Sequence, residues 1–268
     1  MHFLNIVIFP LLEGLLYTLL IFMITLCAAL PLGLLIAFGS MAKWKPISAV
    51  TRGFVWIIRG SPLMLQILLL DVAPGILSQA LGFGIKYALR EPWQHFAMVC
   101  VAFTINYACY FSEIYRGGIQ GVSLGQHEAA QVLGLTKSQT FRKVILLQVI
   151  KRILAPMSNE IITLVKDTAL ASVVIHLDLF TVAKGIVNTN PKYFLWPLLI
   201  AAVFYLLING LLTILNVDKD ELLKKAITPN YDVALPYGAL GALPDKYGES
   251  PNTIYYTWLQ NYGYLAAD

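Results

Sequence analysis

Charged side chains are scarce in this sequence: they make up 13% of its 268 residues, whereas hydrophobic residues make up 58%. Soluble domains carry about 25% charged and roughly 45–50% apolar residues. The composition therefore excludes an ordinary water-soluble enzyme. It also excludes a disordered chain, which needs low hydrophobicity to stay open. So much apolar surface has to be buried, and a lipid bilayer is the environment that this composition predicts.

Cysteine is also rare, and the patterns of a metal site or a catalytic centre are missing. The three cysteines lie in apolar runs without CxxC spacing and are interpreted as small core hydrophobes: Cys27, Cys100 and Cys109. Three histidines have no ligand spacing and are interpreted as incidental: His95, His127 and His176. No GxxxxGK[ST] stretch is present to hold ATP phosphates, and no basic run is typical of a nucleic-acid arm. The sequence predicts a chain that is not an enzyme and holds no cofactor itself.

Five apolar segments are candidates for membrane spans, since about 20 mostly apolar residues cross about 30 Å of hydrocarbon. Three of them contain no charged residue: Gly14–Gly39, Phe96–Ser112 and Tyr193–Val217. The other two, Gly53–Gly82 and Ile153–Leu177, carry a few charges each. The N-terminus lacks a basic region and a clean cleavage signal, so we expect the first span to be retained. The predicted fold class is an all-α integral membrane protein with about five transmembrane helices.

Basic residues are unevenly distributed between the loops. They gather after the first and third expected spans, and few lie in the loops on the other side. Because Lys and Arg collect on the cytoplasmic side, we expect the N-terminus outside and the C-terminus in the cytoplasm. Residues 1–217 contain all five spans. Residues 218–268 form a proline- and tyrosine-rich tail with an excess of acidic over basic residues, which we expect to be cytoplasmic and without a readable function.

Two capping boxes frame a short helix in the loop after the third span. Ser123 with Gln126 predicts a helix start at residue 124, and Gly134 is placed to end that helix. Thr136 with Gln139 then opens the next helix. A short cytoplasmic helix of this kind is suited to fill a groove of another protein. It is equally suited to lie on the membrane surface, and the spacing alone leaves both possibilities open.

Four motifs in order resemble the membrane subunits of ABC importers, in the branch that transports polar amino acids. The run GQHEAAQVLGL at residues 125–135 resembles their EAA loop. Further stretches resemble other motifs of the branch: RGSPL at 59–63 with Gln66, EIYRGGI at 113–119, and the segment from Asn159-Glu160 to KDTAL at 166–170. The resemblance covers about residues 14–215 and implies the permease fold of a type I importer.

The resemblance implies that loop 117–140 docks in a cleft of a cytoplasmic ATPase and couples transport to ATP hydrolysis. The residues that it assigns to this coupling are Gln126, Glu128, Ala129, Ala130, Gly134 and Leu135. The implied partners are an ATPase dimer that binds ATP and Mg²⁺, a second permease subunit (the same chain or a paralogue), an extracytoplasmic solute-binding protein, an amino acid substrate and membrane lipid, with no nucleic acid. The implied location is the bacterial inner membrane, crossed several times.

Three charged residues lie inside the fourth expected span, where each charge costs at least about 2.5–3.5 kcal/mol and usually faces protein or water. Glu160 and Asp167 are seven residues apart and share a helix face, whereas Lys166 lies on another face. The two carboxylates suit an ammonium or guanidinium group. With Thr168, these residues are candidates for the substrate path. A structural ion pair at a broken helix, or charges at the outer interface, are the alternatives.

Two features depart from simple expectations for such a subunit. Asp71-Val72-Ala73-Pro74 stands where the family has an apolar, aromatic segment, and the tail after Asp218 is longer than the family's short basic ending. Arg59 and Glu113 lie near the cytoplasmic ends of their spans, where snorkelling or pairing with each other is expected.

Two other functional classes are weighed against the importer subunit. The first is an ion-coupled secondary transporter or channel that acts without an ATPase, and the second is a membrane scaffold whose cytoplasmic helix binds a signalling partner. Secondary transporters are typically built from internal repeats, and no repeat is visible in this sequence. The order of the four motifs favours the importer subunit.

Overall fold

The computed structural model describes residues 3–80, 91–175 and 177–227. It divides the chain into two compact units, Met1–Glu221 and Leu222–Asp268. The fold described below is that of the first unit. Of the second unit, the structure describes only residues 222–227, which are the last residues of a helix that ends at Ile227. Most of the expected tail, together with Gly82 and His176, therefore lies outside the described residues.

Regular structure in the described part of the chain is helical, as predicted. The α-helices are α1 (Phe9–Ser40), α2 (Lys45–Gly60), α3 (Leu63–Ala80), α4 (Pro92–Gln120), α5 (Leu124–Val132), α6 (Lys137–Thr140), α7 (Leu146–Asp167), α8 (Leu179–Thr189) and α9 (Trp196–Ile227). π-helical turns at Leu4–Ile8 and Phe141–Ile145 precede α1 and α7, and 3-10 turns at Thr168–Val173 and Pro191–Tyr193 follow α7 and α8. Helices satisfy their own backbone hydrogen bonds, which is what lipid requires of a spanning segment.

In the described part of the chain, three helical segments are long and apolar enough to span a membrane: Leu4–Ser40, Pro92–Gln120 and Trp196–Leu215. The number rises to four if α2 and α3 together form one broken span. In the described part of the expected span Gly53–Gly82, the two helices α2 and α3 meet at a 107° bend. Pro62 disfavours helical dihedral angles for the residue before it, and Ser61 accordingly adopts an extended backbone with φ −112° and ψ 146°.

The fourth expected span, Ile153–Leu177, is not among these candidates in the described residues. Its α-helical part, α7, ends at Asp167 and carries basic and acidic residues along its length. Length and composition therefore support three to four spans in the described chain, fewer than the five expected.

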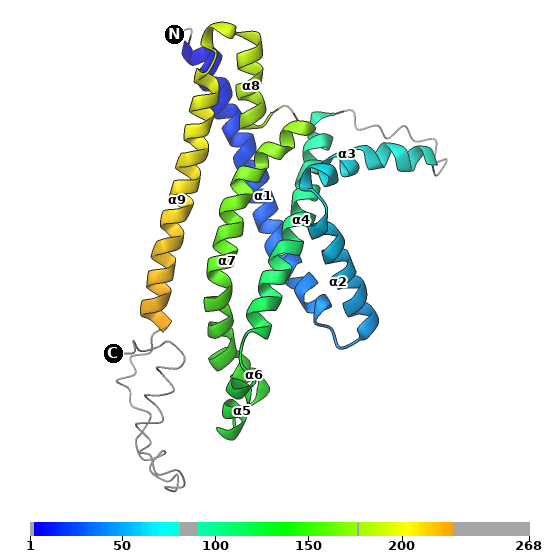
Figure 1. The fold of residues 1–268 in the computed structure, drawn as a ribbon, viewed down its shortest axis with the longest axis vertical. Helices are drawn as coiled ribbons and strands as arrows, with labels where there is room; N and C mark the ends of the chain where they lie inside the picture. The colour runs from blue at the N-terminus through cyan, green and yellow to red at the C-terminus, as the bar shows by residue number, and fades with distance from the viewer. Residues whose placement is uncertain (1–2, 81–90, 176, 228–268) are drawn as a thin grey trace. The chain divides into compact units, whose positions relative to one another are not determined.

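Helix α1 packs along α4, which lies beside α7 (Figure 1). Gly33 allows the closest approach of α1 to α4, since a Cβ atom at this position would lie 2.9 Å from the Ala108 carbonyl oxygen and the Phe111 Cβ. The core between these helices is formed by fully buried aromatic and aliphatic side chains, including Phe103 and Leu164. Helix α4 is thus the central helix of this core, and the polar residues described below lie on it or pack against it.

Helix α8 is fixed to the first half of α1 by a buried joint. The Leu179 backbone N–H donates a hydrogen bond of 3.0 Å to Oγ1 of Thr18, and Gly14 leaves room for the Leu179 backbone. Asp178 caps α8 by accepting hydrogen bonds from the backbone N–H groups of Phe180 and Thr181. Burial raises the pKa of the Asp178 carboxyl, and its hydrogen bonds from Thr181 and Phe180 oppose this effect.

Candidate coupling loop and transport path

The loop between α4 and α7 folds largely as its capping boxes predict. Helix α5 begins at Leu124, and Gly134 follows it with a φ of +72°, a conformation that glycine adopts without strain. The box of Thr136 and Gln139 is present in full, with both reciprocal hydrogen bonds. At the first box, the side-chain oxygen of Gln126 accepts a hydrogen bond of 3.1 Å from Gln148 of α7, which ties α5 to the returning helix.

Helix α5 offers apolar and acidic side chains to solvent. Leu124, Val132 and Leu133 are 77%, 87% and 76% exposed, and Glu128 is exposed as well. By contrast, Ala130 is only 2% exposed. Of the remaining residues that the motif assigns to coupling, Leu135 is half-buried, and its N–H donates to the Ala130 carbonyl; the side chain of Ala129 lies outside the described side chains. Exposed apolar side chains on a polar helix are typical of a protein-docking surface.

The base of this loop is held by close packing of α4 on α7. A Cβ atom on Gly118 would collide with Cγ2 of Ile153, so the two helices approach more closely here than any larger residue would permit. Val122, Ile145 and Val149 form a buried cluster beside this contact. These contacts hold the end of α4 against α7 at the base of the loop.

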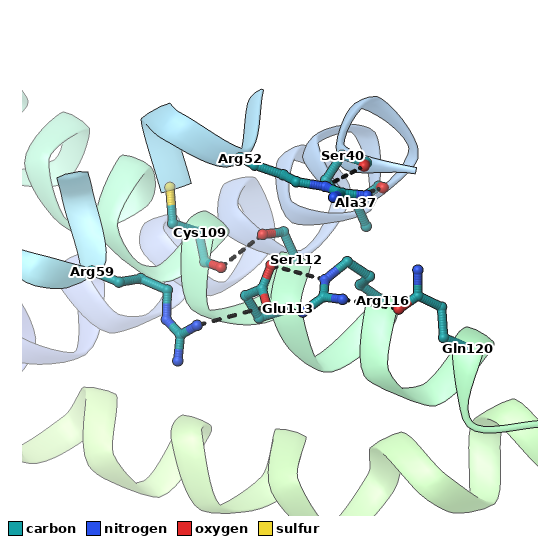
Figure 2. A network of polar contacts seen from close by, with 9 residues as sticks. All are labelled: Ala37, Ser40, Arg52, Arg59, Cys109, Ser112, Glu113, Arg116 and Gln120. Carbon is teal, nitrogen blue, oxygen red and sulfur yellow. Dashed lines mark hydrogen bonds and ion pairs between the residues drawn. The ribbon is translucent and has the colours of Figure 1, made fainter. Parts of the chain in front are cut away.

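An open cleft of about 550 Å³ lies between α2 and α4. Its lining combines three arginines with one carboxylate: Arg52, Val55, Trp56, Arg59, Gly60, Tyr110, Glu113 and Arg116. The expected pairing of Arg59 with Glu113 is confirmed, with an N–O distance of 3.8 Å. Arg116 also pairs with Glu113, through Nε and Nη2 (Figure 2).

The arginines of the cleft differ in how tightly they are held. Arg116 donates a further hydrogen bond to the side chain of Gln120, and Arg52 donates to the Ser40 carbonyl at the end of α1 (Figure 2). The Arg59 guanidinium instead lies 4.9 Å from the ring centroid of Tyr110, a cation–π geometry. Its side chain is 41% exposed. The Arg59 guanidinium is thus shared between Glu113 and the Tyr110 ring and stays partly exposed in the cleft.

The carboxylates of α7 face the same part of α4. The Tyr107 hydroxyl donates a hydrogen bond of 2.7 Å to Oδ2 of Asp167. Glu160 lies within electrostatic range of Arg59 and Asp167, and both carboxylates act on Tyr107. Their seven-residue spacing does place them on one face. We refer to Arg59, Glu113, Glu160 and Asp167 with the rings of Tyr107 and Tyr110 as the polar cluster.

The other two residues predicted for the substrate path lie differently. Lys166 is exposed, on a face away from Glu160 as the six-residue spacing predicts. Thr168 is fully buried, and its hydroxyl donates to the Val165 carbonyl. The structure therefore brings Glu160 and Asp167 together with Arg59, and it brings neither Lys166 nor Thr168 into that group by a direct hydrogen bond among the described residues.

Sequence reasoning missed several partners. Tyr107 carries no motif, and only the packing of α4 against α7 reveals it as the partner of Asp167. The interpretation of His95 as incidental is wrong, because its Nδ1 lies 2.7 Å from Oδ1 of Asp71 and joins α4 to α3. Gln66 belongs to a recognised motif, yet its hydrogen bond to Asn106 on α4 has no signal in the sequence.

Comparisons with known proteins agree with this architecture. Residues 29–217 match the family model described as "Binding-protein-dependent transport system inner membrane component". The arginine transport system permease protein ArtQ of Bacillus subtilis is 32% identical over 213 residues, which cover 80% of this chain and 92% of that protein. The nopaline transport system permease protein NocM of Agrobacterium fabrum is 35% identical over 159 residues, which cover 58% of this chain and 64% of that protein.

A solved structure has the same fold. It is described as the crystal structure of an amino acid ABC transporter with histidines, and it superposes with a TM-score of 0.67 at 32% identity, covering 79% of this chain and 93% of that chain. Members of the matched family are multi-pass permease subunits of the inner membrane. They act with a separate ATPase, which binds the nucleotide, and with a binding protein. With 189 of its 268 residues inside the matched region 29–217, this chain belongs to the family of binding-protein-dependent transport system inner membrane components.

Proposed function

We propose that the chain forms, with a second permease subunit, the transmembrane path of an importer for polar amino acids, and that the polar cluster lines this path. The observation that carries the proposal is the convergence of Arg59, Glu160 and Asp167 on Tyr107 and Tyr110 of α4. An amino acid carries an ammonium group and a carboxylate, and the cluster offers carboxylates for the first and a guanidinium for the second. The excess of carboxylates favours substrates with a second positive charge.

The proposed topology has five spans in a type I permease fold, with the N-terminus outside and the C-terminus in the cytoplasm. Residues 1–217 form the permease domain in this proposal, with α7 crossing the membrane beside the other spans. Glu160 and Asp167 of α7 support this, because they lie on the face toward α4, where protein and not lipid surrounds them. The residues 218–268 would lie in the cytoplasm, and no function is proposed for them.

The second subunit, either another copy of the chain or a paralogue, would close the open side of the path. Lys166 and Thr168 complete the proposed path, since Lys166 is exposed next to Asp167 and is placed to meet a substrate carboxylate or a carboxylate of the partner. Symmetric pairing of two permease subunits would bring two polar clusters to one interface. Membrane lipid would cover the remaining apolar faces.

We further propose that loop 117–140 docks on the ATPase. The exposed side chains of α5, including Glu128, supply the contact surface, and Gln126, Ala129, Ala130, Gly134 and Leu135 give α5 its shape. Because α5 follows α4 in the chain and is hydrogen-bonded to α7 through Gln126 and Gln148, movement of the ATPase would displace the helices that carry the polar cluster.

The test is uptake by the complete transporter, with its ATPase and binding protein, in proteoliposomes. Labelled arginine, glutamine and leucine serve as cationic, polar and apolar substrates. Asp167→Asn and Glu160→Gln should each lower uptake of the preferred substrate by about tenfold, the effect of roughly 1.4 kcal/mol. Glu13→Gln, at an exposed position of α1, is the matched control and should leave uptake unchanged. Unaltered uptake in both cluster variants, or a preference for leucine, would refute the proposed path.

A further inference from the structure

We infer that Gln66 is a positioning residue for transport: its side-chain amide replaces hydrogen bonds lost at the α2–α3 bend and joins the bend to α4, and this holds Arg59 at the polar cluster. The inference rests on the proposed function of that cluster. Gln66 itself is buried at 8% exposure, so its role is to place Arg59 and not to touch substrate.

The bend creates a need for hydrogen-bond donors. The last carbonyl groups of a helix have no partner within it, and in a membrane each unsatisfied group costs several kcal/mol. At the end of α2 the Ser61 hydroxyl donates to the Ile57 carbonyl at 2.9 Å. The Gln66 Nε2 lies 2.7 Å from the Ile58 carbonyl oxygen, 3.1 Å from the Ser61 carbonyl oxygen and 2.8 Å from the Ser61 Oγ. The Gln66 side chain of α3 thus donates hydrogen bonds to carbonyl groups at the end of α2.

The other end of the same amide reaches α4. Oε1 of Gln66 accepts a hydrogen bond of 2.9 Å from Nδ2 of Asn106, which is itself only 4% exposed. An amide donates from one atom and accepts at another, so Gln66 can serve the carbonyls of the bend through Nε2 and Nδ2 of Asn106 through Oε1. An ionised carboxylate would repel the carbonyls, and an apolar side chain would remove the hydrogen bonds to the Ser61 carbonyl and from Asn106.

This link falls at the part of α4 that carries the cluster. Asn106 precedes Tyr107, the partner of Asp167, and lies one helical turn from Tyr110, over which the Arg59 guanidinium lies. Arg59 directly follows Ile58, whose carbonyl is bonded to Gln66. The hydrogen bonds of Gln66 therefore fix the end of α2 against the turn of α4 that presents the two tyrosines.

The first test asks whether Gln66 acts through Arg59. Gln66→Met keeps the length of the side chain and removes the amide, and it should lower uptake by the complete transporter by about tenfold, the effect of one lost buried hydrogen bond. In an Arg59→Gln background the same change should have little further effect, because two residues that act through one interaction are not additive. Gln79→Met, at an exposed position of α3, is the matched control. Full additivity of the Gln66 and Arg59 changes would overturn the inference.

The second test does not depend on the proposed path. Spin labels at Gly53→Cys of α2 and Gly117→Cys of α4, two positions with open space for a side chain, report the distance between the helices in the assembled transporter with Cys27 replaced by Ala. Gln66→Met should broaden this distance distribution, and Gln79→Met should not. An unchanged distribution would overturn the role of Gln66 even where Asp167→Asn abolishes uptake. A broadened distance distribution with normal uptake would overturn the role of Gln66 in transport. The proposed substrate path is tested separately, by uptake in the Asp167 and Glu160 variants.

Discussion

The Tyr107 hydroxyl donates a hydrogen bond of 2.7 Å to the Asp167 carboxylate and so joins the middle of α4 to the end of α7. The Tyr107 ring is held parallel to that of Phe103, at a centroid distance of 6.4 Å. Ring packing and hydrogen bond can be separated, because phenylalanine fills the same space without the hydroxyl. A single substitution at Tyr107 can therefore test whether this hydrogen bond is needed for the function of the polar cluster.

Tyr107→Phe should lower the uptake rate about 10- to 100-fold, since a hydrogen bond to a charged group is worth about 1.5–3 kcal/mol. Assembly with the ATPase should be retained because the ring stays in the core. Tyr17→Phe is the control: its ring meets Phe96 edge-on, and no hydrogen bond of its hydroxyl is found among the described residues. Uptake at the normal rate in Tyr107→Phe would show that Asp167 needs no partner on α4.

Thr18→Val should destabilise the assembled complex by about 1–3 kcal/mol, because the buried Leu179 N–H loses its acceptor. The joint between α1 and α8 depends on this bond. Thermal unfolding in detergent should show a Tm lower by about 2–4 °C per kcal/mol for a chain of this size.

The same helix supplies the control for that change. Thr25 is also fully buried, and its hydroxyl oxygen has no hydrogen-bond partner in the described structure. Thr25→Val should therefore leave the Tm unchanged or raise it, since an unpaired buried hydroxyl is replaced by a methyl group. Equal losses in the two variants would mean that packing, and not the Leu179 hydrogen bond, accounts for the effect at Thr18.

Much of the helical framework could be predicted because its signals are local. Gly134 and the Thr136–Gln139 box determine their own stretch of backbone, and the structure confirms both. Pro62 is a local signal for a break between α2 and α3, but the 107° angle of the bend is not, because hydropathy does not record the direction of a helix. Length and composition alone support three to four spans in the described residues, because α7 carries charged residues along its length.

The site could be predicted only in part, because its partners come from distant segments. The spacing of Glu160 and Asp167 places them on one helix face, a property of α7 alone. Nothing in α7 indicates that this face meets Tyr107, or that Arg59 approaches Glu160 from another helix. His95 was misjudged in the same way, since its partner Asp71 lies on α3 and pairing between helices leaves no periodic signal in the sequence.

Gly118→Ala should weaken the contact between α4 and α7, because the added methyl group would collide with Cγ2 of Ile153. Overpacking of this kind costs about 1–3 kcal/mol, and we expect a lower Tm together with poorer coupling of ATP hydrolysis to uptake. The neighbouring Gly117→Ala meets nothing within 4 Å and should be neutral. Ile153→Ala combined with Gly118→Ala should recover part of the loss, and no recovery would contradict the steric explanation.

The turn after α5 can be tested with two glycines nine residues apart. Gly134 has a φ of +72°, whereas Gly125 lies within helix α5, and a Cβ atom at either position would meet nothing within 4 Å. Gly134→Ala therefore adds only backbone strain, about 1–2 kcal/mol for a left-handed residue, and should weaken binding of the ATPase roughly 5- to 30-fold. Gly125→Ala should leave binding unchanged or improve it, because alanine favours the helix. Binding of the purified ATPase to the permease measures both, and an equal loss in the two variants would show that the surface of α5, and not the turn at Gly134, governs docking.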